Sequence, residues 1–234
     1  MQNIRAFIFD IDGTLVDSNE LHVDSWDRAF RKFGKEFPKD KLRAEIGKGS
    51  DQYLPEFLSE TEIAEFGKDL DEYRSEIFRE EYLPRVKPFP KVRDLFRRIR
   101  DDGKRIVLAS SGKKKDTEYY VGLLGIDKLI EGYTSAEDAG RSKPAPDIFT
   151  AALEKLGEND GPIRANEAIA VGDTPFDVEA AAKIGLRTIA LTCGGKTEEV
   201  LRKAGAIAIY KDPADLLAHL TQIAGRSDAA LRRK

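Results

Sequence analysis

Residues 4–18 read Ile4-Arg5-Ala6-Phe7-Ile8-Phe9-Asp10-Ile11-Asp12-Gly13-Thr14-Leu15-Val16-Asp17-Ser18. The run before Asp10 is apolar except for Arg5, which predicts a buried strand of the parallel type. The strand ends in two carboxylates, and burying Asp10 and Asp12 together is costly unless a cation or hydrogen bonds compensate. A surface turn would explain Gly13, but not the direct passage from an apolar strand into Asp-x-Asp. Because ligands of open α/β sheets bind at the carboxyl ends of strands, this position favours chemistry.

The length and charge of the chain limit the class of protein. Its 234 residues suffice for one large α/β domain, or for a core with a small insert. Charged residues make up 35% of the chain, yet the formal net charge is only -3, which argues against a general nucleic-acid-binding protein. We find no basic, apolar leader before the first strand and no apolar run of membrane-spanning length. We therefore expect a cytoplasmic protein with neither nucleic acid nor membrane as partner.

The chain changes character twice along its length. From about Glu20 to Leu83 it has no strand-like run, and its apolar positions recur near helical spacing, which predicts four or five helices. From Pro88 onward strands and helices alternate, which predicts a parallel sheet covered by helices on both faces. The expected strands are residues 105–109, 168–171, 187–191 and 206–210, and the expected helices are 91–101, 114–124, 146–156, 175–184, 197–204 and 212–223.

We therefore expect an α/β fold built from two parts. Residues 1–17 and 86–234 form a Rossmann-like core with a parallel sheet. Residues 18–85 form a helical insert between the first strand and the rest of that core.

Two polar segments are expected beside Asp10 in such a sheet. Ser110 and Ser111 directly follow the strand at 105–109, where hydroxyl and amide donors can bind an anion. Lys143 lies in Lys143-Pro144-Ala145-Pro146-Asp147, where prolines restrict the backbone and an ammonium group suits a phosphate or carboxylate. Taken singly, the serines are also ordinary loop residues, and the lysine could simply precede a helix.

A third segment, Gly172-Asp173-Thr174-Pro175-Phe176-Asp177, again follows an apolar strand. Asp177 lies one helical turn after Asp173 and is expected to face the same way, although either residue alone could be a helix cap. Carboxylates gathered at one edge of a sheet suit Mg²⁺, which binds hard oxygen ligands together with substrate phosphate.

The four segments resemble, in order and over the whole chain, the motifs of the haloacid dehalogenase-like (HAD) hydrolase superfamily. Residues 10–15 match D-x-D-G-T-[LV], residues 143–147 match K-P-x-P-[DE], and residues 172–177 match G-D-x-x-x-D. The helical insert resembles the C1 cap of subfamily I in its position. True haloacid dehalogenases resemble this first motif without Asp12, and phosphonatases place a small residue there, so Asp12 points to phosphate-ester chemistry.

The resemblance implies a role for each matching residue. Asp10 would be the nucleophile that forms an aspartyl-phosphate, and Asp12 would protonate the leaving group and then activate water. Mg²⁺ would be held by Asp10, the backbone carbonyl of Asp12, and Asp173. The remaining roles concern the phosphoryl group: Ser110 and Lys143 would position its oxygens, Thr14 and Ser111 would assist, and Asp177 would orient Lys143 or a metal-bound water.

Three further candidates come from the insert and its rim. Leu21-His22-Val23-Asp24-Ser25-Trp26 resembles the opening of caps in the phosphoglycolate phosphatase and β-phosphoglucomutase group, which implies that His22 faces the site. Lys48, in a Gly-Lys-Gly-Ser loop similar to the cap loop that approaches the catalytic centre, is expected to meet a substrate carboxylate or hydroxyl. Lys113 is expected at the rim. Each could also be an ordinary surface residue.

The resemblance implies a Mg²⁺-dependent phosphatase for a small phosphorylated metabolite, phosphoglycolate or a sugar phosphate. One alternative is a β-phosphoglucomutase-like phosphotransferase, although the mutase cap loop carries an arginine where this chain has Lys48 and Ser50. The other is a non-catalytic regulatory module, which is disfavoured because Asp10, Asp12, Lys143 and Asp173 are all present. The expected partner is a small-molecule phosphate ester, and the expected state is a monomer or a homodimer.

Overall fold

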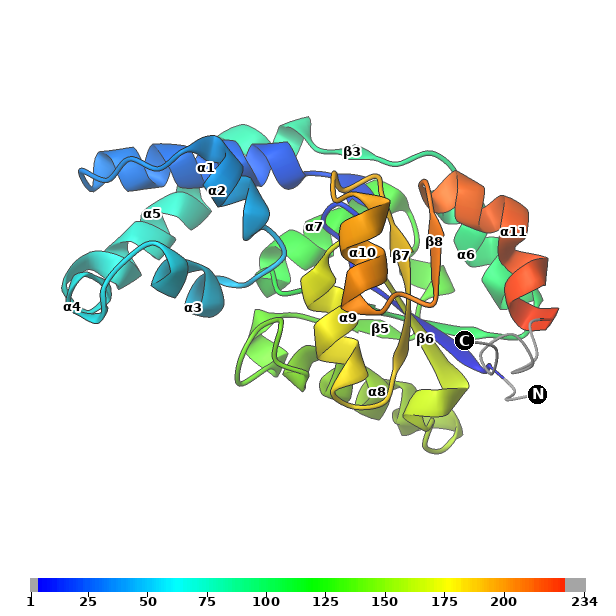
Figure 1. Cartoon of the computed structure of the whole chain (residues 1–234). Coiled ribbons are helices and arrows are strands. Elements are labelled where there is room, and N and C mark those ends of the chain that lie inside the picture. Colours follow the sequence, from blue (N-terminus) through cyan, green and yellow to red (C-terminus); the bar gives the residue numbers. More distant parts are fainter. Residues whose placement is uncertain (1–3, 226–234) are drawn as a thin grey trace.

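The computed structural model describes residues 4–225, without the side chains of residues 159, 160 and 222–225. Residues 1–3 and 226–234, which belong to the predicted core, lie outside the described part. A six-stranded sheet has the order β5-β4-β1-β6-β7-β8, and every pairing in it is parallel (Figure 1). Its strands are β1 (Ala6–Phe9), β4 (Arg105–Ala109), β5 (Gly132–Thr134), β6 (Ala168–Gly172), β7 (Arg187–Leu191) and β8 (Ala208–Tyr210).

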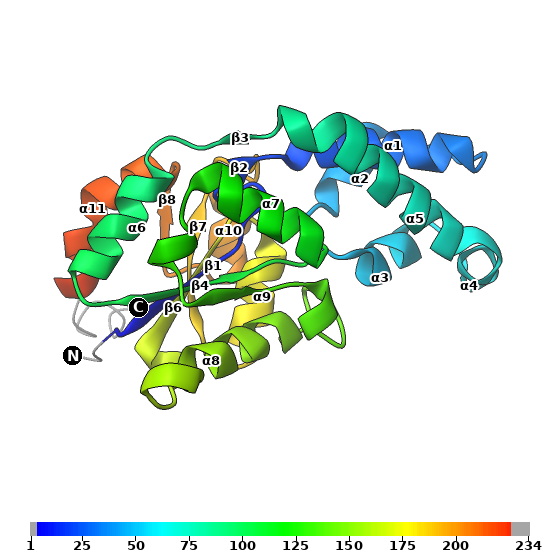
Figure 2. The same cartoon turned by 180° about the vertical axis from the view of Figure 1, so that it is seen from behind.

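Helices cover both faces of this sheet, and the alternation of side chains along the strands divides the core accordingly. Phe7 and Phe9 of β1 pack with α6 (Val92–Asp101), α7 (Lys114–Leu124) and α11 (Pro213–Gly225) on one face. Figure 2 shows these three helices on the same side of the sheet. Ala6 and Ile8 pack with α8 (Asp147–Asp160) and α9 (Pro175–Ala182) on the other. The remaining helix of the core, α10 (Glu198–Ala204), packs against α9. The predicted α/β fold class is confirmed.

A helical segment lies between β1 and the rest of the sheet, and a two-stranded antiparallel ribbon joins it to the core. The ribbon pairs β2 (Val16–Asp17) with β3 (Lys87–Pro88). The α-helices of the segment are α1 (Asn19–Lys32), α2 (Lys39–Ala44), α3 (Ser50–Tyr53), α4 (Glu60–Glu62) and α5 (Lys68–Ile77), with short 3₁₀ and π turns between Leu54 and Arg85. They extend to one side of the sheet in Figure 1. Division of the chain at residues 17/18 and 85/86 stays a prediction, and residues 18–85 are called the insert below.

The insert has an apolar core of its own. Trp26 and Phe30 of α1 stack with Tyr53 of α3, with ring centroids 4.5 Å and 6.4 Å apart. Leu42 of α2 and Leu70 of α5 complete this buried cluster. Because its apolar side chains face inward among themselves, the insert leaves its polar loops free to meet the sheet edge.

Element boundaries differ from prediction where the local pattern is weak. The helix expected at 146–156 continues to Asp160, and β8 begins at Ala208 rather than at residue 206. The edge strand β5 was not predicted, because Gly132-Tyr133-Thr134 is too short to show alternation. Within residues 4–225, no helix combines the length and the apolar character needed to span a membrane.

Candidate functional site

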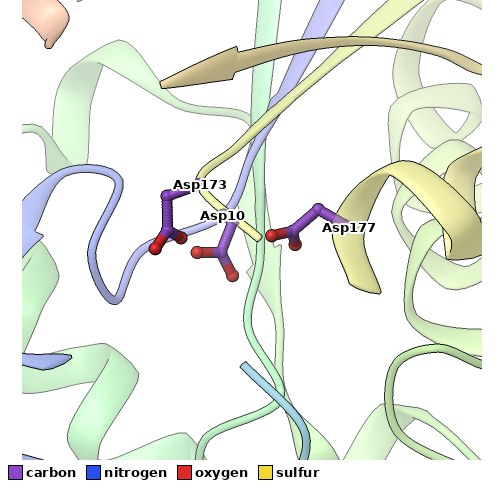
Figure 3. A group of neighbouring side chains, drawn as sticks. All are labelled: Asp10, Asp173 and Asp177. Atoms are coloured by element: carbon purple, nitrogen blue, oxygen red, sulfur yellow. The ribbon is translucent and has the colours of Figure 1, made fainter. Parts of the chain in front are cut away.

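The predicted polar segments meet at one edge of the sheet. The central strand β1 has β4 and β6 as neighbours, and their carboxyl ends lead directly into Asp10, Ser110 and Asp173. Figure 3 shows the carboxylates of Asp10, Asp173 and Asp177 turned toward one another. Parallel pairing alone produces this convergence, because equivalent ends of parallel strands lie side by side.

These three buried aspartates form an acidic cluster whose ligand atoms all lie within 4.8 Å of one another. Thr14 Oγ1 lies 3.1 Å from Asp10 Oδ2 and 3.1 Å from Asp173 Oδ1, so it bridges the two carboxylates. Burial raises the pKa of Asp10 to about 7 against the opposing effect of Lys143, and burial also raises the pKa of Asp173 well above its usual value. Buried carboxylates whose negative charge is only partly neutralised suit a divalent cation that prefers oxygen ligands.

Lys143 lies between two of these aspartates. Its ammonium group contacts Asp10 Oδ1, lies 2.7 Å from Asp177 Oδ1 and donates to the Ala109 carbonyl at 3.2 Å. Burial by itself would lower the pKa of Lys143, but the two carboxylates raise it. The lysine is therefore a fixed, fully charged group beside the predicted nucleophile.

Asp177 is held by the start of its own helix. Its Oδ2 accepts hydrogen bonds from the Thr174 hydroxyl at 2.6 Å and the Thr174 amide at 3.0 Å. The other oxygen, Oδ1, faces Lys143. The contact expected from sequence between Asp177 and Lys143 is thus present, and Asp177 also belongs to the acidic cluster.

Asp12 faces away from the acidic cluster toward the insert. Its Oδ1 accepts from Ser18 Oγ at 2.6 Å and lies 2.8 Å from His22 Nε2. A guanidinium nitrogen of Arg74 contacts the other ring nitrogen, Nδ1. Since arginine can only donate, Nδ1 must accept, so Nε2 carries the proton that is donated to Asp12. Burial would raise the pKa of Asp12, but His22 and Ser18 lower it to about 2.

The loop after β4 supplies hydroxyl groups. Ser110 is buried, and its Oγ accepts from the Gly112 amide at 2.9 Å. The Ser111 hydroxyl is buried and has no hydrogen-bond partner among the described residues. Both Ser111 and Gly112 line the same cavity as Asp10 and Asp12. An unpaired hydroxyl in this position is free to bind an oxygen of a ligand.

The cavity has a volume of about 120 Å³ and lies between the sheet edge and the insert. Lys48 lines it but pairs with Glu45 at 2.5 Å and with Glu56 at 2.7 Å. Lys113 lines it but pairs with Asp71 at 3.1 Å. In this arrangement both predicted basic residues are engaged by carboxylates of the insert rather than left open for a substrate carboxylate.

The sequence interpretation missed several residues of the site. Asn19 donates from Nδ2 to Asp173 Oδ2 at 2.9 Å and to the Gly194 carbonyl at 2.8 Å. Arg74, from α5, has no carboxylate within 4 Å among the residues that the structure describes, although it lines the cavity. A Cβ at Gly194 would lie only 1.7 Å from Asp173 Oδ2. The glycine was predictable, since it follows β7, the strand beside β6, but the contacts of Asn19 and Arg74 depend on the docking of the insert.

Comparison with known proteins gives consistent relatives. A family model for haloacid dehalogenase-like hydrolases matches residues 4–185. The "Phosphorylated carbohydrates phosphatase" of Thermotoga maritima is 25% identical over 221 residues, which cover 94% of this chain and 100% of the relative. The "Phosphoglycolate phosphatase" of Aquifex aeolicus is 26% identical over 190 residues, which cover 79% of this chain and 83% of the relative. A solved hydrolase from Pseudomonas syringae superposes with a TM-score of 0.83 at 27% identity, covering 94% and 99%.

Proposed function

Because the chain belongs to the haloacid dehalogenase-like hydrolase family, we propose that it is a Mg²⁺-dependent phosphatase acting on a small phosphate ester through an aspartyl-phosphate at Asp10. The observation that carries the proposal is the surroundings of Asp10. Its buried carboxylate contacts the ammonium of Lys143, lies in one cluster with Asp173, and lines a cavity. The names of two relatives, both phosphatases, support the same reaction class.

The acidic cluster fits a divalent cation, because its carboxylates are buried and Lys143 is the only side-chain cation within 4 Å of them in the part of the chain that the structure describes. Asp10, Asp173 and the backbone carbonyl of Asp12 would hold Mg²⁺. When bound, the ion would reduce the repulsion between the attacking carboxylate and the anionic phosphate. Thr14 and Asn19 support this set, since Thr14 bridges Asp10 and Asp173 and Asn19 donates to Asp173.

In the first step an oxygen of Asp10 attacks phosphorus, the bond from phosphorus to the leaving oxygen breaks, and Asp12 gives that oxygen its proton. Asp12 must therefore be protonated when the ester is bound, although the free site keeps it ionised. The negative charge of an entering phosphate raises the pKa of a neighbouring carboxylate, which favours this protonation. Lys143 and the hydroxyls of Ser110 and Ser111 would hold the phosphoryl oxygens.

In the second step water attacks the phosphorus of the aspartyl-phosphate, its proton passes to Asp12, and the bond to Asp10 breaks. The hydrogen bonds from His22 and Ser18 suit this step because they stabilise Asp12 as a carboxylate ready to accept the proton. Asp177 keeps the ammonium of Lys143 in place throughout.

We base the proposed substrate class on the size of the cavity and on the names of the relatives. A volume of about 120 Å³ admits a phosphate with a small organic group, so phosphoglycolate and small sugar phosphates are the first candidates. Lys48 and Lys113 would contact such a substrate only after exchanging their present carboxylate partners. A cytoplasmic location and a monomeric or homodimeric state remain predictions.

The test is phosphate release from a panel of small phosphate esters, with and without Mg²⁺. We expect Mg²⁺-dependent release that Asp10→Asn abolishes, while Asp17→Asn, at an exposed position of the ribbon, retains it. Absence of release from every ester in the intact protein would refute the phosphatase. Conversion of β-glucose 1-phosphate into the 6-phosphate would then identify a mutase, and absence of both reactions would favour the non-catalytic regulatory module.

A further inference from the structure

A hydrogen-bonded contact joins the insert to the loop that carries Lys143. The Ser142 hydroxyl donates to Asp51 Oδ1 at 2.5 Å, and the Ser142 amide donates to Asp51 Oδ2 at 3.1 Å. The amide of Gly49 donates to Ser142 Oγ at 2.9 Å. One buried serine of the core therefore makes three hydrogen bonds to the start of α3 and to Gly49, the residue that precedes this helix.

The backbone of the insert approaches this serine closely. A Cβ at Gly49 would lie 2.6 Å from the Cβ of Ser142, so only glycine allows the amide at position 49 to reach the serine hydroxyl. Burial would raise the pKa of Asp51, but the two donors of Ser142 lower it, so the contact is charge-assisted. Such a bidentate contact fixes both the side chain and the backbone of Ser142.

Ser142 directly precedes the lysine beside the nucleophile. Two further hydrogen bonds hold the loop that carries Lys143. The Ala145 amide donates to the Ser142 carbonyl at 2.9 Å, and Lys183 Nζ donates to the Pro144 carbonyl at 2.7 Å. These two bonds remain within the core, whereas the bonds of Asp51 come from the insert. The insert therefore contributes directly to the position of the backbone from which Lys143 extends.

We propose that Asp51 is a positioning residue. It binds Ser142 through two hydrogen bonds when the insert covers the sheet edge, and thereby helps to hold Lys143 against Asp10. The proposal rests on the proposed function in one respect, namely that Lys143 binds the phosphoryl group. Core partners hold the ammonium of Lys143 in either case, but the backbone beside it is held from the insert only while the insert is docked, so that docking and chemistry are coupled.

Two other contacts between insert and core lie away from this loop. Arg79 Nε donates to Asp116 Oδ1 of α7 at 2.8 Å. Lys196 Nζ donates to the carbonyls of Arg43 and Ala44, at the end of α2, at 2.9 Å and 2.8 Å. Arg79 neither lines the cavity nor touches the loop of Lys143. Arg79→Gln is therefore the matched control for a variant that only weakens the docking of the insert on the core.

The kinetic test is a double-mutant cycle between Asp51→Ala and Ser142→Ala. We expect each single variant to lower kcat roughly 10- to 100-fold, as small displacements of catalytic groups do, and the double variant to cost no more than the larger single one. Asp51→Asn keeps one acceptor and should recover part of kcat. Arg79→Gln should raise KM and leave kcat nearly unchanged. If Asp51 instead contacts substrate directly, the two effects will multiply, and the proposal is overturned.

A second readout requires no substrate. In hydrogen–deuterium exchange of the intact protein, Asp51→Ala should speed exchange of the Ser142 amide and its neighbours, and Arg79→Gln should not. If the wild-type protein hydrolyses no ester, the proposed function fails, but hydrogen–deuterium exchange still shows whether Asp51 holds the backbone at Ser142. If it hydrolyses esters but neither exchange nor kcat responds to Asp51→Ala, only the positioning role fails.

Discussion

His22 Nε2 lies 2.8 Å from Asp12 Oδ1, which links the first helix of the insert to the loop after β1. The Arg74 guanidinium contacts Nδ1 of the same ring and so selects the tautomer that donates to Asp12. Asp12 thus owes the orientation and the low pKa of its carboxylate largely to a residue of the insert. A proposed acid–base residue of the core is therefore complete only when the insert is docked.

The first prediction concerns His22→Ala. Loss of the hydrogen bond leaves the Asp12 carboxylate less well oriented, so proton transfer to a poor leaving group suffers most. We expect kcat for alkyl phosphates to fall roughly 100-fold, within the usual range for general acid catalysis. An aryl phosphate with an acidic phenol should be affected much less in its first step, because its leaving group needs no proton. Rapid-quench measurement of phosphoenzyme formation with both esters checks this.

The matched control is the only other histidine, His219, which pairs with Asp215 on α11. His219→Ala should leave both esters unaffected. Equal losses for alkyl and aryl phosphates in His22→Ala would contradict a role through Asp12.

The second prediction concerns the metal-free protein. The pKa of Asp10 is raised from 3.8 to about 7, so the folded state binds its proton more tightly than the unfolded state does. The free energy of unfolding should therefore fall as the pH rises from about 4 to about 7, by on the order of a few kcal/mol. Asp12 contributes in the opposite sense, but its change lies below that window, because its folded pKa is about 2.

Thermal melting in EDTA across this pH range checks the sign. Asp10→Asn should melt with a shallower slope, and Mg²⁺ should flatten the slope of the wild-type protein by favouring the ionised cluster. An unchanged slope in Asp10→Asn would show that Asp10 is not the titrating group.

Much of the site was predictable from sequence, because it depends on local pattern and on one rule of sheet geometry. Asp10, Ser110 and Asp173 each follow an apolar run, and parallel strands bring their carboxyl ends together. Lys143 was found from its flanking prolines. The sequence therefore specified the part of the site that belongs to the core.

The rest depends on how the insert packs, which periodicity does not encode. Nothing in the sequence pairs Asp51 with Ser142, because 91 positions separate them and both look like ordinary polar loop residues. Lys48 was assigned to a substrate group, yet Glu45 lies three positions earlier and Glu56 eight positions later, and both bind it. Glu45 could have been recognised from sequence as a partner of Lys48, because residues three positions apart are neighbours in helical backbone.

The third prediction concerns Lys143→Met. Its side chain and that of Asp177 are each 1% exposed, so the substitution leaves buried carboxylates without a cation. We expect loss of activity together with a loss of stability of about 3–5 kcal/mol in EDTA. Urea denaturation measures the loss, and the double variant Lys143→Met/Asp177→Asn should recover part of it. No recovery in the double variant would show that the lysine stabilises the fold through packing rather than charge.

The fourth prediction separates the metal site from the lysine. A methyl group at Gly194 would lie 1.7 Å from Asp173 Oδ2, so Gly194→Ala must displace that carboxylate or the loop itself. Loss of one well-placed ligand should raise the Mg²⁺ concentration for half-maximal activity by 10-fold or more, roughly the cost of disturbing a ligand's support. Calorimetric titration with Mg²⁺ reports the same change without substrate.

The control for this steric effect is Gly122→Ala, in α7, where the added methyl group meets no described atom within 4 Å apart from its chain neighbours and the nearby backbone of its own helix. It should leave Mg²⁺ binding unchanged and stabilise the helix slightly, since alanine favours a helix over glycine by about 0.5–1 kcal/mol. If Gly194→Ala and Asp173→Asn both bind Mg²⁺ as the wild-type protein does, Asp173 does not hold the ion.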